Sequence, residues 1–161
     1  MRKIIPIILI VVAVMVSCTT LDCPLNNTVY AKYKLKGSIA KLSDTLTIST
    51  TRLAGTDSVL INKDVNIDSF ILPMSYTQPE DVFFFEMRDT VLHEVFKDTV
   101  KVKKEDQPHF ESVDCKPSYF HTITSIETTH NRIDSIVINH KEVNYDATKT
   151  HFYIYFGERT E

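Results

Sequence analysis

Three cysteines carry the most versatile chemistry in this chain, namely Cys18, Cys23 and Cys115. A cysteine sulfur can form a thioether, a disulfide or a bond to a metal, and its surroundings decide which of these applies. No Cys-x-x-Cys pair occurs, and Cys23 lies in an entry segment rich in Pro and Asn, so neither a redox dithiol nor a catalytic thiol is expected. The cysteines therefore indicate attachment and cross-linking.

The residues before Cys18 have the layout of an export signal. Two basic residues precede an apolar run over residues 4–16, whose 13 residues are too few for a helix across a bilayer, since roughly 20 are needed. Met15-Val16-Ser17-Cys18 resembles the lipobox of bacterial lipoproteins, which implies cleavage before Cys18 and acylation of its thiol and new amino group. A secretory signal with an incidental cysteine is the alternative. We expect a signal peptide at 1–17 and a lipidated tether at 18–24.

The acyl chains on Cys18 predict how the protein is held. Each buried methylene adds about 0.8 kcal/mol of membrane affinity, and one chain alone holds only marginally, so two or three chains make release negligible. No acidic run follows Cys18, whereas some gut-bacterial lipoproteins carry one there as a surface-export signal. We expect an envelope protein, anchored in the outer membrane and facing the periplasm.

The remaining pair, Cys23 and Cys115, predicts a disulfide. An exported compartment is oxidising, and an even number of cysteines there usually pairs. The bond would close a loop of about 92 residues, worth up to about 4–5 kcal/mol by the chain-entropy argument. Two free thiols, or a bridge to another protein, are the alternatives.

A triplet of Asp, then Ser or Thr, then an apolar residue recurs along the chain. Its hydroxyl residues are Thr45, Ser58, Ser69, Thr90, Thr99 and Ser135. The triplet resembles the acceptor motif of the general O-glycosylation system of Bacteroides-type bacteria, and only the Ser69 triplet has an unusual third residue. A turn-closing aspartate before a strand is the structural explanation. We expect glycan on at least one of the other five, with Thr45, Ser58 and Thr90 as the first candidates.

The metal candidates are weak. Oxygen side chains alternate at Asn62, Asp64, Asn66 and Asp68 as at the start of a calcium loop, but the turn glycine and the closing Glu are missing. A polar strand edge explains the alternation equally well. The six His residues include no i, i+4 or His-x-His pair that would preset a zinc site. No cofactor is expected.

No catalytic motif is found. The chain lacks a Gly-x-Ser-x-Gly elbow, a phosphate loop and His-Glu-x-x-His, and it has only three glycines. The carboxylates of Glu80 and Asp81 could form a glycosidase pair, but charges beside a proline turn are usually solvated loop. We expect a protein that is not an enzyme.

Composition excludes a nucleic-acid partner. Removing Arg2 and Lys3 from the 18 basic residues leaves 16 against 21 acidic ones, a net charge of −5 without a basic stripe. Tryptophan is absent, which weakens a sugar-stacking site, although seven Tyr remain.

The elements that must position these residues are all β. Short runs rich in Val, Ile, Thr, Phe and Tyr are bounded by Asp, Asn, Gly or Pro, which predicts a single antiparallel β-sandwich, or an open barrel, over residues 25–157. The expected strands are 29–36, 45–50, 58–62, 69–72, 82–87, 99–103, 119–128, 135–139 and 152–156. The apolar run Val82–Phe85 predicts a strand covered on both faces, and Thr90–Phe96 also fits one face of a helix.

Several segments together resemble a known family. The pattern Pro-x-Phe-x-Ser-x-x-Cys in Gln107–Cys115 is the most specific, and Cys23-Pro24, Ile71–Met74 and Asn131–Ile138 accompany it. They are similar to a family of uncharacterised Bacteroidetes lipoproteins with a domain of unknown function, over residues 22–156. The resemblance implies a lipid anchor, a β-rich domain and paired cysteines, and it implies no activity. The stretch Val91–Phe96 is a departure from the family.

A non-enzymatic binding or assembly module is the function that these observations favour. Loops or a sheet edge would hold another envelope protein or a glycan. Within Ser75–Glu80, Tyr76 is either an exposed anchor of a binding loop or a side chain packed on the core. A calcium- or metal-stabilised domain, and a glycan-acting enzyme, are the alternatives.

Overall fold

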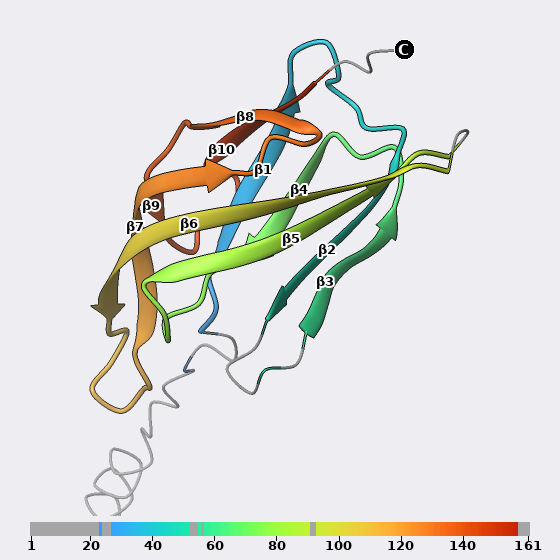
Figure 1. The fold of residues 1–161 in the computed structure, drawn as a ribbon. Coiled ribbons are helices and arrows are strands. Elements are labelled where there is room, and N and C mark those ends of the chain that lie inside the picture. Colours follow the sequence, from blue (N-terminus) through green and yellow to red (C-terminus); the bar gives the residue numbers. More distant parts are fainter. Residues whose placement is uncertain (1–22, 24–26, 52–54, 56, 91–92, 158–161) are drawn as a thin grey trace, which may run out of the picture.

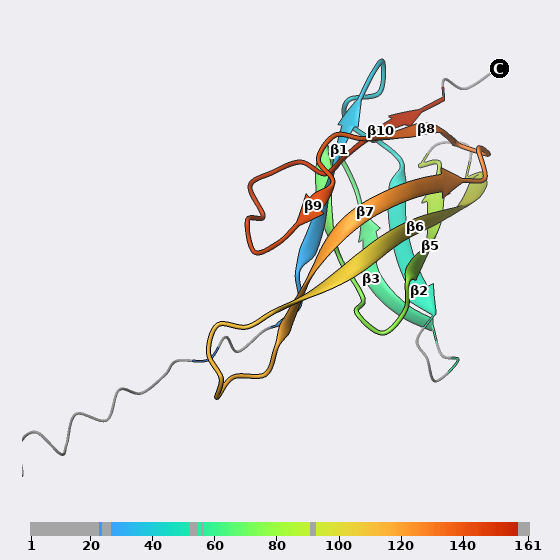
Figure 2. The same ribbon diagram turned by 90° about the vertical axis from the view of Figure 1, so that its left-hand side faces the viewer.

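The computed structural model describes Cys23, residues 27–51, Gly55, and residues 57–90 and 93–157, and it contains two stacked β-sheets (Figures 1 and 2). The all-β sandwich predicted from sequence is confirmed over these residues. The strands are β1 (Tyr30–Lys36), β2 (Thr45–Thr51), β3 (Asp57–Asp64), β4 (Ser69–Pro73), β5 (Glu80–Arg88), β6 (Val95–His109), β7 (Ser118–Thr128), β8 (Ile133–Ile138), β9 (Glu142–Val143) and β10 (Phe152–Phe156). No helix in the described part is long and apolar enough to cross a membrane.

The two sheets differ in size and in the direction of their strands. One has four strands in the order β4-β1-β10-β8, and the other has six in the order β3-β2-β5-β6-β7-β9. Strand pairs are antiparallel except for β1 and β10, which are parallel. The first and last strands of the domain therefore lie side by side in the middle of one sheet.

Alternation along each strand places one side-chain set in the core. In β1, for example, Ala31, Tyr33 and Leu35 are buried, as expected for a strand with one face on the partner sheet. The Tyr33 ring stacks between Phe70 and Phe152, with ring centroids 5.1 and 4.6 Å away. Aromatic stacking of this kind stabilises a core beyond the area that it buries.

One expectation about an individual segment is wrong, and a segment left open between strand and helix is resolved in part. Phe83 and Phe85 are buried, but Phe84 between them is 39% exposed, so β5 is covered on one face only. In the described chain nothing lies over the outer face of the six-stranded sheet at this point (Figure 2). Within Thr90–Phe96, the residues from Val95 onward belong to β6 rather than to a helix, and 91–92 are outside the described residues.

A long hairpin extends the six-stranded sheet at one end. Strands β6 and β7 have 15 and 11 residues, and their register shifts between Lys103 and Lys104, which marks a β-bulge. Residues 110–117 connect them and carry Cys115. Figures 1 and 2 place this loop at one end of the sandwich and the end of β10 at the other.

Candidate functional site

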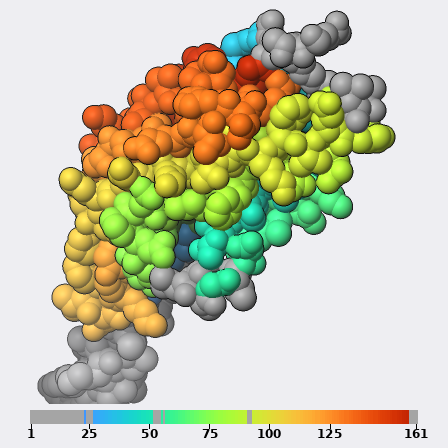
Figure 3. All heavy atoms as spheres, in the orientation of Figure 1, coloured from blue at the N-terminus to red at the C-terminus, as the bar shows by residue number. Residues whose placement is uncertain are grey.

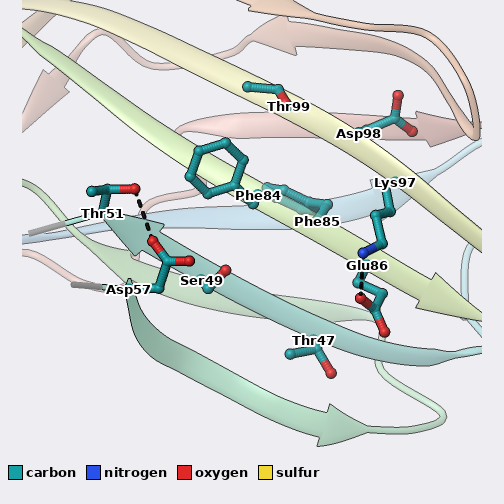
Figure 4. Close-up of a pocket in the computed structure, with 10 residues that line it drawn as sticks. All are labelled: Thr47, Ser49, Thr51, Asp57, Phe84, Phe85, Glu86, Lys97, Asp98 and Thr99. Atoms are coloured by element: carbon teal, nitrogen blue, oxygen red, sulfur yellow. Dashed lines mark hydrogen bonds and ion pairs between the residues drawn. The ribbon is translucent and has the colours of Figure 1, made fainter. Parts of the chain in front are cut away.

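A shallow pocket of about 570 Å³ lies on the outer face of the six-stranded sheet (Figure 4). Its lining residues come from β2, β3, β5 and β6, and they are Thr47, Ser49, Thr51, Asp57, Phe84, Phe85, Glu86, Lys97, Asp98 and Thr99. Phe84 lies at the middle of this face, because its register partners are Ser49 on β2 and Thr99 on β6. An exposed aromatic ring surrounded by hydroxyl groups can offer a ligand both apolar contact and hydrogen bonds.

Charged groups flank the ring on two sides. Glu86 pairs with Lys97 across β5 and β6 at 3.2 Å and with Arg88 at 3.6 Å, while Thr51 Oγ1 donates to Asp57 Oδ1 at 3.0 Å. Exposed pairs of this kind contribute at most about 1 kcal/mol to folding, so these groups can exchange partners with a ligand at small cost.

Asp98 borders the same pocket but is not available to a ligand. Its carboxylate is turned away from Phe84 in Figure 4 and accepts four hydrogen bonds in the interior. Burial raises the pKa of this group, but the hydrogen bonds from the backbone N–H groups of Asn131, Ile133 and Arg132 outweigh it and leave the pKa below its usual value. Asp98 therefore holds the turn between β7 and β8, where the chain passes from one sheet to the other.

A buried charge cluster lies within the sandwich around Lys104. The Lys104 side chain is 0% exposed, and its Nζ donates to the Gln78 carbonyl at 2.6 Å and pairs with Asp81 at 3.4 Å and Asp106 at 3.8 Å. Burial raises the pKa of Asp81 to about 6, and the Lys104 charge limits that rise. Lys104 follows the alternation of β6, in which Val100 and Val102 also face inward, and the extra residue of the nearby bulge is Thr124 on β7. Lys104 and Asp81 are closed off from solvent while Asp106 is partly exposed at the edge, and the cluster has a structural role.

The Glu80–Asp81 pair considered as a glycosidase site does not converge. The two residues are neighbours on β5, so their side chains point to opposite faces, and Asp81 is committed to Lys104 and to the Ser75 N–H. His121 is buried beside this cluster, with Nδ1 2.7 Å from Asp106 Oδ1. Burial lowers the pKa of His121, and the hydrogen bond with Asp106 opposes that shift.

The four candidate metal ligands lie at the end of β3 and in the connection to β4. Asn62 and Asp64 belong to β3; Asp64 Oδ1 accepts from the Val65 N–H at 2.9 Å, and Asp68 Oδ1 accepts from Ser69 Oγ at 2.9 Å. Asn66 has a positive φ of 58°, a conformation that asparagine tolerates in a turn. Among the described residues, no group of three or more His, Cys, Asp or Glu is placed to hold a metal ion.

Two histidines eleven residues apart in sequence lie close together. The rings of His140 and His151 lie 5.9 Å apart, and His151 Nδ1 accepts a hydrogen bond from the Lys32 N–H at 2.9 Å. Burial lowers the pKa of His151, and the nearby His140 lowers it further. A neutral His151 therefore links the β9–β10 connection to β1.

The candidate glycosylation residues differ in accessibility. Thr90 is exposed just after β5, whereas Thr45, Ser58, Thr99 and Ser135 are half-buried within strands. Thr99 also lines the pocket, and Ser135 Oγ donates to Asp134 at 3.0 Å. Because a transferase needs a free hydroxyl, Thr90 is the best placed of the five.

The disulfide predicted between Cys23 and Cys115 is present, and it joins the start of the domain to the β6–β7 loop. Asn27 Nδ2 adds hydrogen bonds to the carbonyls of Lys116 and Pro117 at 3.5 and 3.4 Å. Tyr76 is 58% exposed at the same end of the sandwich, and its ring stacks on Tyr119 at 4.7 Å. Of the two expectations for Tyr76, an exposed side chain or one packed on the core, the structure shows the exposed one. Cys18 lies outside the described residues.

The pocket and the buried cluster were both missed by the sequence reasoning. Phe84 lies within the apolar run Val82–Phe85, and its polar neighbours Ser49 and Thr99 are known only from the strand pairing in the structure. Lys104 lies just beyond the expected strand 99–103, and the signal that could have found it is its alternation with Val100 and Val102.

Comparison with known proteins identifies a family and no activity. No curated protein and no solved structure matches the chain. A family described as a family of unknown function, DUF6452, matches residues 45–156, which include nine of the ten strands. The chain therefore belongs to the DUF6452 family.

Proposed function

We propose that this protein is a lipid-anchored envelope protein that binds a partner protein through the outer face of its six-stranded sheet and catalyses no reaction. The Cys18 lipid holds it in the outer membrane, with the domain in the periplasm. The observation that carries the binding role is Phe84, an exposed aromatic ring in a pocket at the middle of a sheet face.

The composition of this face supports a protein partner. Phe84 is flanked by Val82 on its own strand and by Val59 on β3, which is also exposed. Hydroxyls and the Glu86–Lys97 pair surround this apolar centre. Protein interfaces commonly have such an aromatic or apolar centre, which contributes most of the affinity, within a polar rim.

The chemistry of the face supports a binding role rather than catalysis. Asp98 is the pocket residue whose pKa is lowered, and its carboxylate accepts hydrogen bonds from the β7–β8 turn. Glu86 is paired with Lys97. Asp81 and His121, whose pKa values are also shifted, lie in the closed interior. A general acid or base must lie within hydrogen-bond distance of its substrate, and none of these groups is placed to contact one.

Site-specific photo-crosslinking in the native host tests the partner. The variant Phe84→p-benzoylphenylalanine places a photoreactive ring at the pocket, and the matched control is Ile71→p-benzoylphenylalanine, because Ile71 is 48% exposed on β4 of the other sheet. We expect a discrete protein adduct from position 84 and none from position 71. Equal labelling at both positions, or none at either, would contradict the proposed surface.

A glycan ligand is the second candidate, favoured by the hydroxyls of Thr47, Ser49 and Thr51 beside the ring. In that case position 84 gives no protein adduct, and retention on purified envelope glycan is lost in Phe84→Ala but kept in Ile71→Ala. The anchor is tested separately by the intact mass of protein extracted in detergent, which should equal a chain that begins at Cys18 and carries two or three acyl chains.

A further inference from the structure

The loop between β6 and β7 exposes apolar side chains at its tip. Val113 is 98% exposed and Phe110 is 63% exposed, and both lie in residues 110–117. An apolar side chain that projects from the tip of a hairpin, away from the sandwich, contributes nothing to the core. Exposed apolar side chains grouped on one loop are available to contact a membrane or another protein.

The disulfide fixes where this tip stands relative to the anchor. Cys115, two residues after Val113, is bonded to Cys23, with 5.5 Å between their Cα atoms. Cys23 is five positions after Cys18, and a fully extended chain of five steps spans at most roughly 18 Å. A lipid on Cys18 thus keeps the loop within a short distance of the bilayer surface.

We infer that residues 110–117 lie against the bilayer that holds the Cys18 lipid, with Phe110 and Val113 inserted at the boundary between headgroups and acyl chains. This inference rests on the proposed lipid anchor. The occupant of the exposed tip is a lipid surface, because the covalent tether already brings that surface to the loop.

The charges of the loop set the depth of insertion. Glu111, Asp114 and Lys116 are exposed on the same loop, and Glu111 is 3.1 Å from His109 Nε2. Carboxylates and ammonium groups stay in the headgroup region, so the tip enters only the outer part of the bilayer, as interfacial segments do at about 5–10 Å depth.

Aromatic rings with polar ends stand behind the tip. Tyr76 stacks on Tyr119, and Tyr145 packs edge-on against Phe120 at 5.1 Å while its hydroxyl donates to Ser118 Oγ. Tyrosine side chains favour the membrane–water interface, because the ring is apolar and the hydroxyl is polar.

This contact orients the whole domain. Because the loop and the end of β10 lie at opposite ends of the sandwich (Figures 1 and 2), the Gly157 end points away from the membrane. The space-filling view in Figure 3 shows the same loop projecting as the lower corner of the described surface. The outer face of the six-stranded sheet is then presented beside the membrane, open to a partner in the periplasm.

The absence of tryptophan in the chain allows a direct test. Phe110→Trp and Val113→Trp each introduce one fluorophore at a site that is already exposed, and Ile71→Trp is the matched control on β4. The full lipidated protein is reconstituted into vesicles that contain brominated lipids, and vesicle flotation is measured first. Bromine quenches tryptophan on contact and so reports depth.

We expect all three variants to float, with a blue shift and a loss of emission at positions 110 and 113 and neither at position 71. Bromines near the headgroup should quench more than bromines near the chain ends. Flotation without quenching at 110 and 113 would overturn the orientation while keeping the anchor, and would leave the tip to a protein partner. Failure to float would overturn the lipid anchor itself and the inference with it.

Discussion

Replacing Asp98 with alanine should destabilise the domain severely. Asp98 Oδ2 accepts from the N–H groups of Arg132 and Ile133 at 2.8 and 2.9 Å, and both bonds are buried. Each buried donor left without an acceptor costs about 1–3 kcal/mol, so these two alone give about 2–6 kcal/mol. Oδ1 adds bonds from Asn131 N–H and Thr129 Oγ1 at 2.7 and 2.8 Å. Since a domain has only about 5–15 kcal/mol of stability, Asp98→Ala should sit near the limit of folding.

Urea unfolding of the mature, disulfide-bonded chain, carrying Cys18→Ser so that no detergent is needed, measures this loss. Asp98→Asn keeps one acceptor oxygen and should lose less than Asp98→Ala. The matched control Lys97→Ala changes the next residue of β6, whose side chain is exposed, and should stay within about 0.5 kcal/mol of the parent. A loss below about 1 kcal/mol for Asp98→Ala would refute the role given to these bonds.

The pH dependence gives an independent check on Asp98. Its pKa in the folded chain lies below the value in the unfolded chain, so the carboxylate binds fewer protons when folded. Its stabilisation is therefore fully present above about pH 4 and is lost as the pH falls through the folded pKa. The stability difference between the parent and Asp98→Asn should be constant near neutral pH and should shrink in acid.

Further variants test the disulfide, the buried cluster and the glycan. Replacing Cys23 and Cys115 together with Ser should lower the free energy of unfolding by about 4–5 kcal/mol, measured in urea, because the loop between them is long. Lys104→Met should cost about 3–5 kcal/mol by leaving the Asp81 carboxylate buried and unpaired, and adding Asp81→Asn should recover much of that loss. Because the pKa of Asp81 is raised to about 6, the folded chain keeps a proton that the unfolded chain releases near pH 4. The free energy of unfolding should therefore fall as the pH rises from about 4 to about 6, and Asp81→Asn should remove that fall. Protein from the native host should lose one discrete sugar mass in Thr90→Ala.

Local sequence patterns predicted the strands of this fold because alternation and turn residues act within a few positions. The nine expected runs all correspond to strands, although β6 begins four residues earlier and ends six later than expected. The disulfide followed from the same kind of counting, once the export signal indicated an oxidising compartment. Signal cleavage, lipidation and glycosylation stay predictions.

What the sequence determined by itself was therefore a β domain with one cross-link, and the tether at its N-terminus stays a prediction. The tertiary structure alone decided which strands are neighbours, including the parallel pair β1–β10, and hence which side chains share a face. Phe84 is exposed because no layer of the described chain covers its side of the sheet, and the buried Lys104 ammonium is accommodated by its partner Asp81 on the neighbouring β5. Such outcomes depend on pairing between segments far apart in the chain, and no local pattern of residues encodes that pairing.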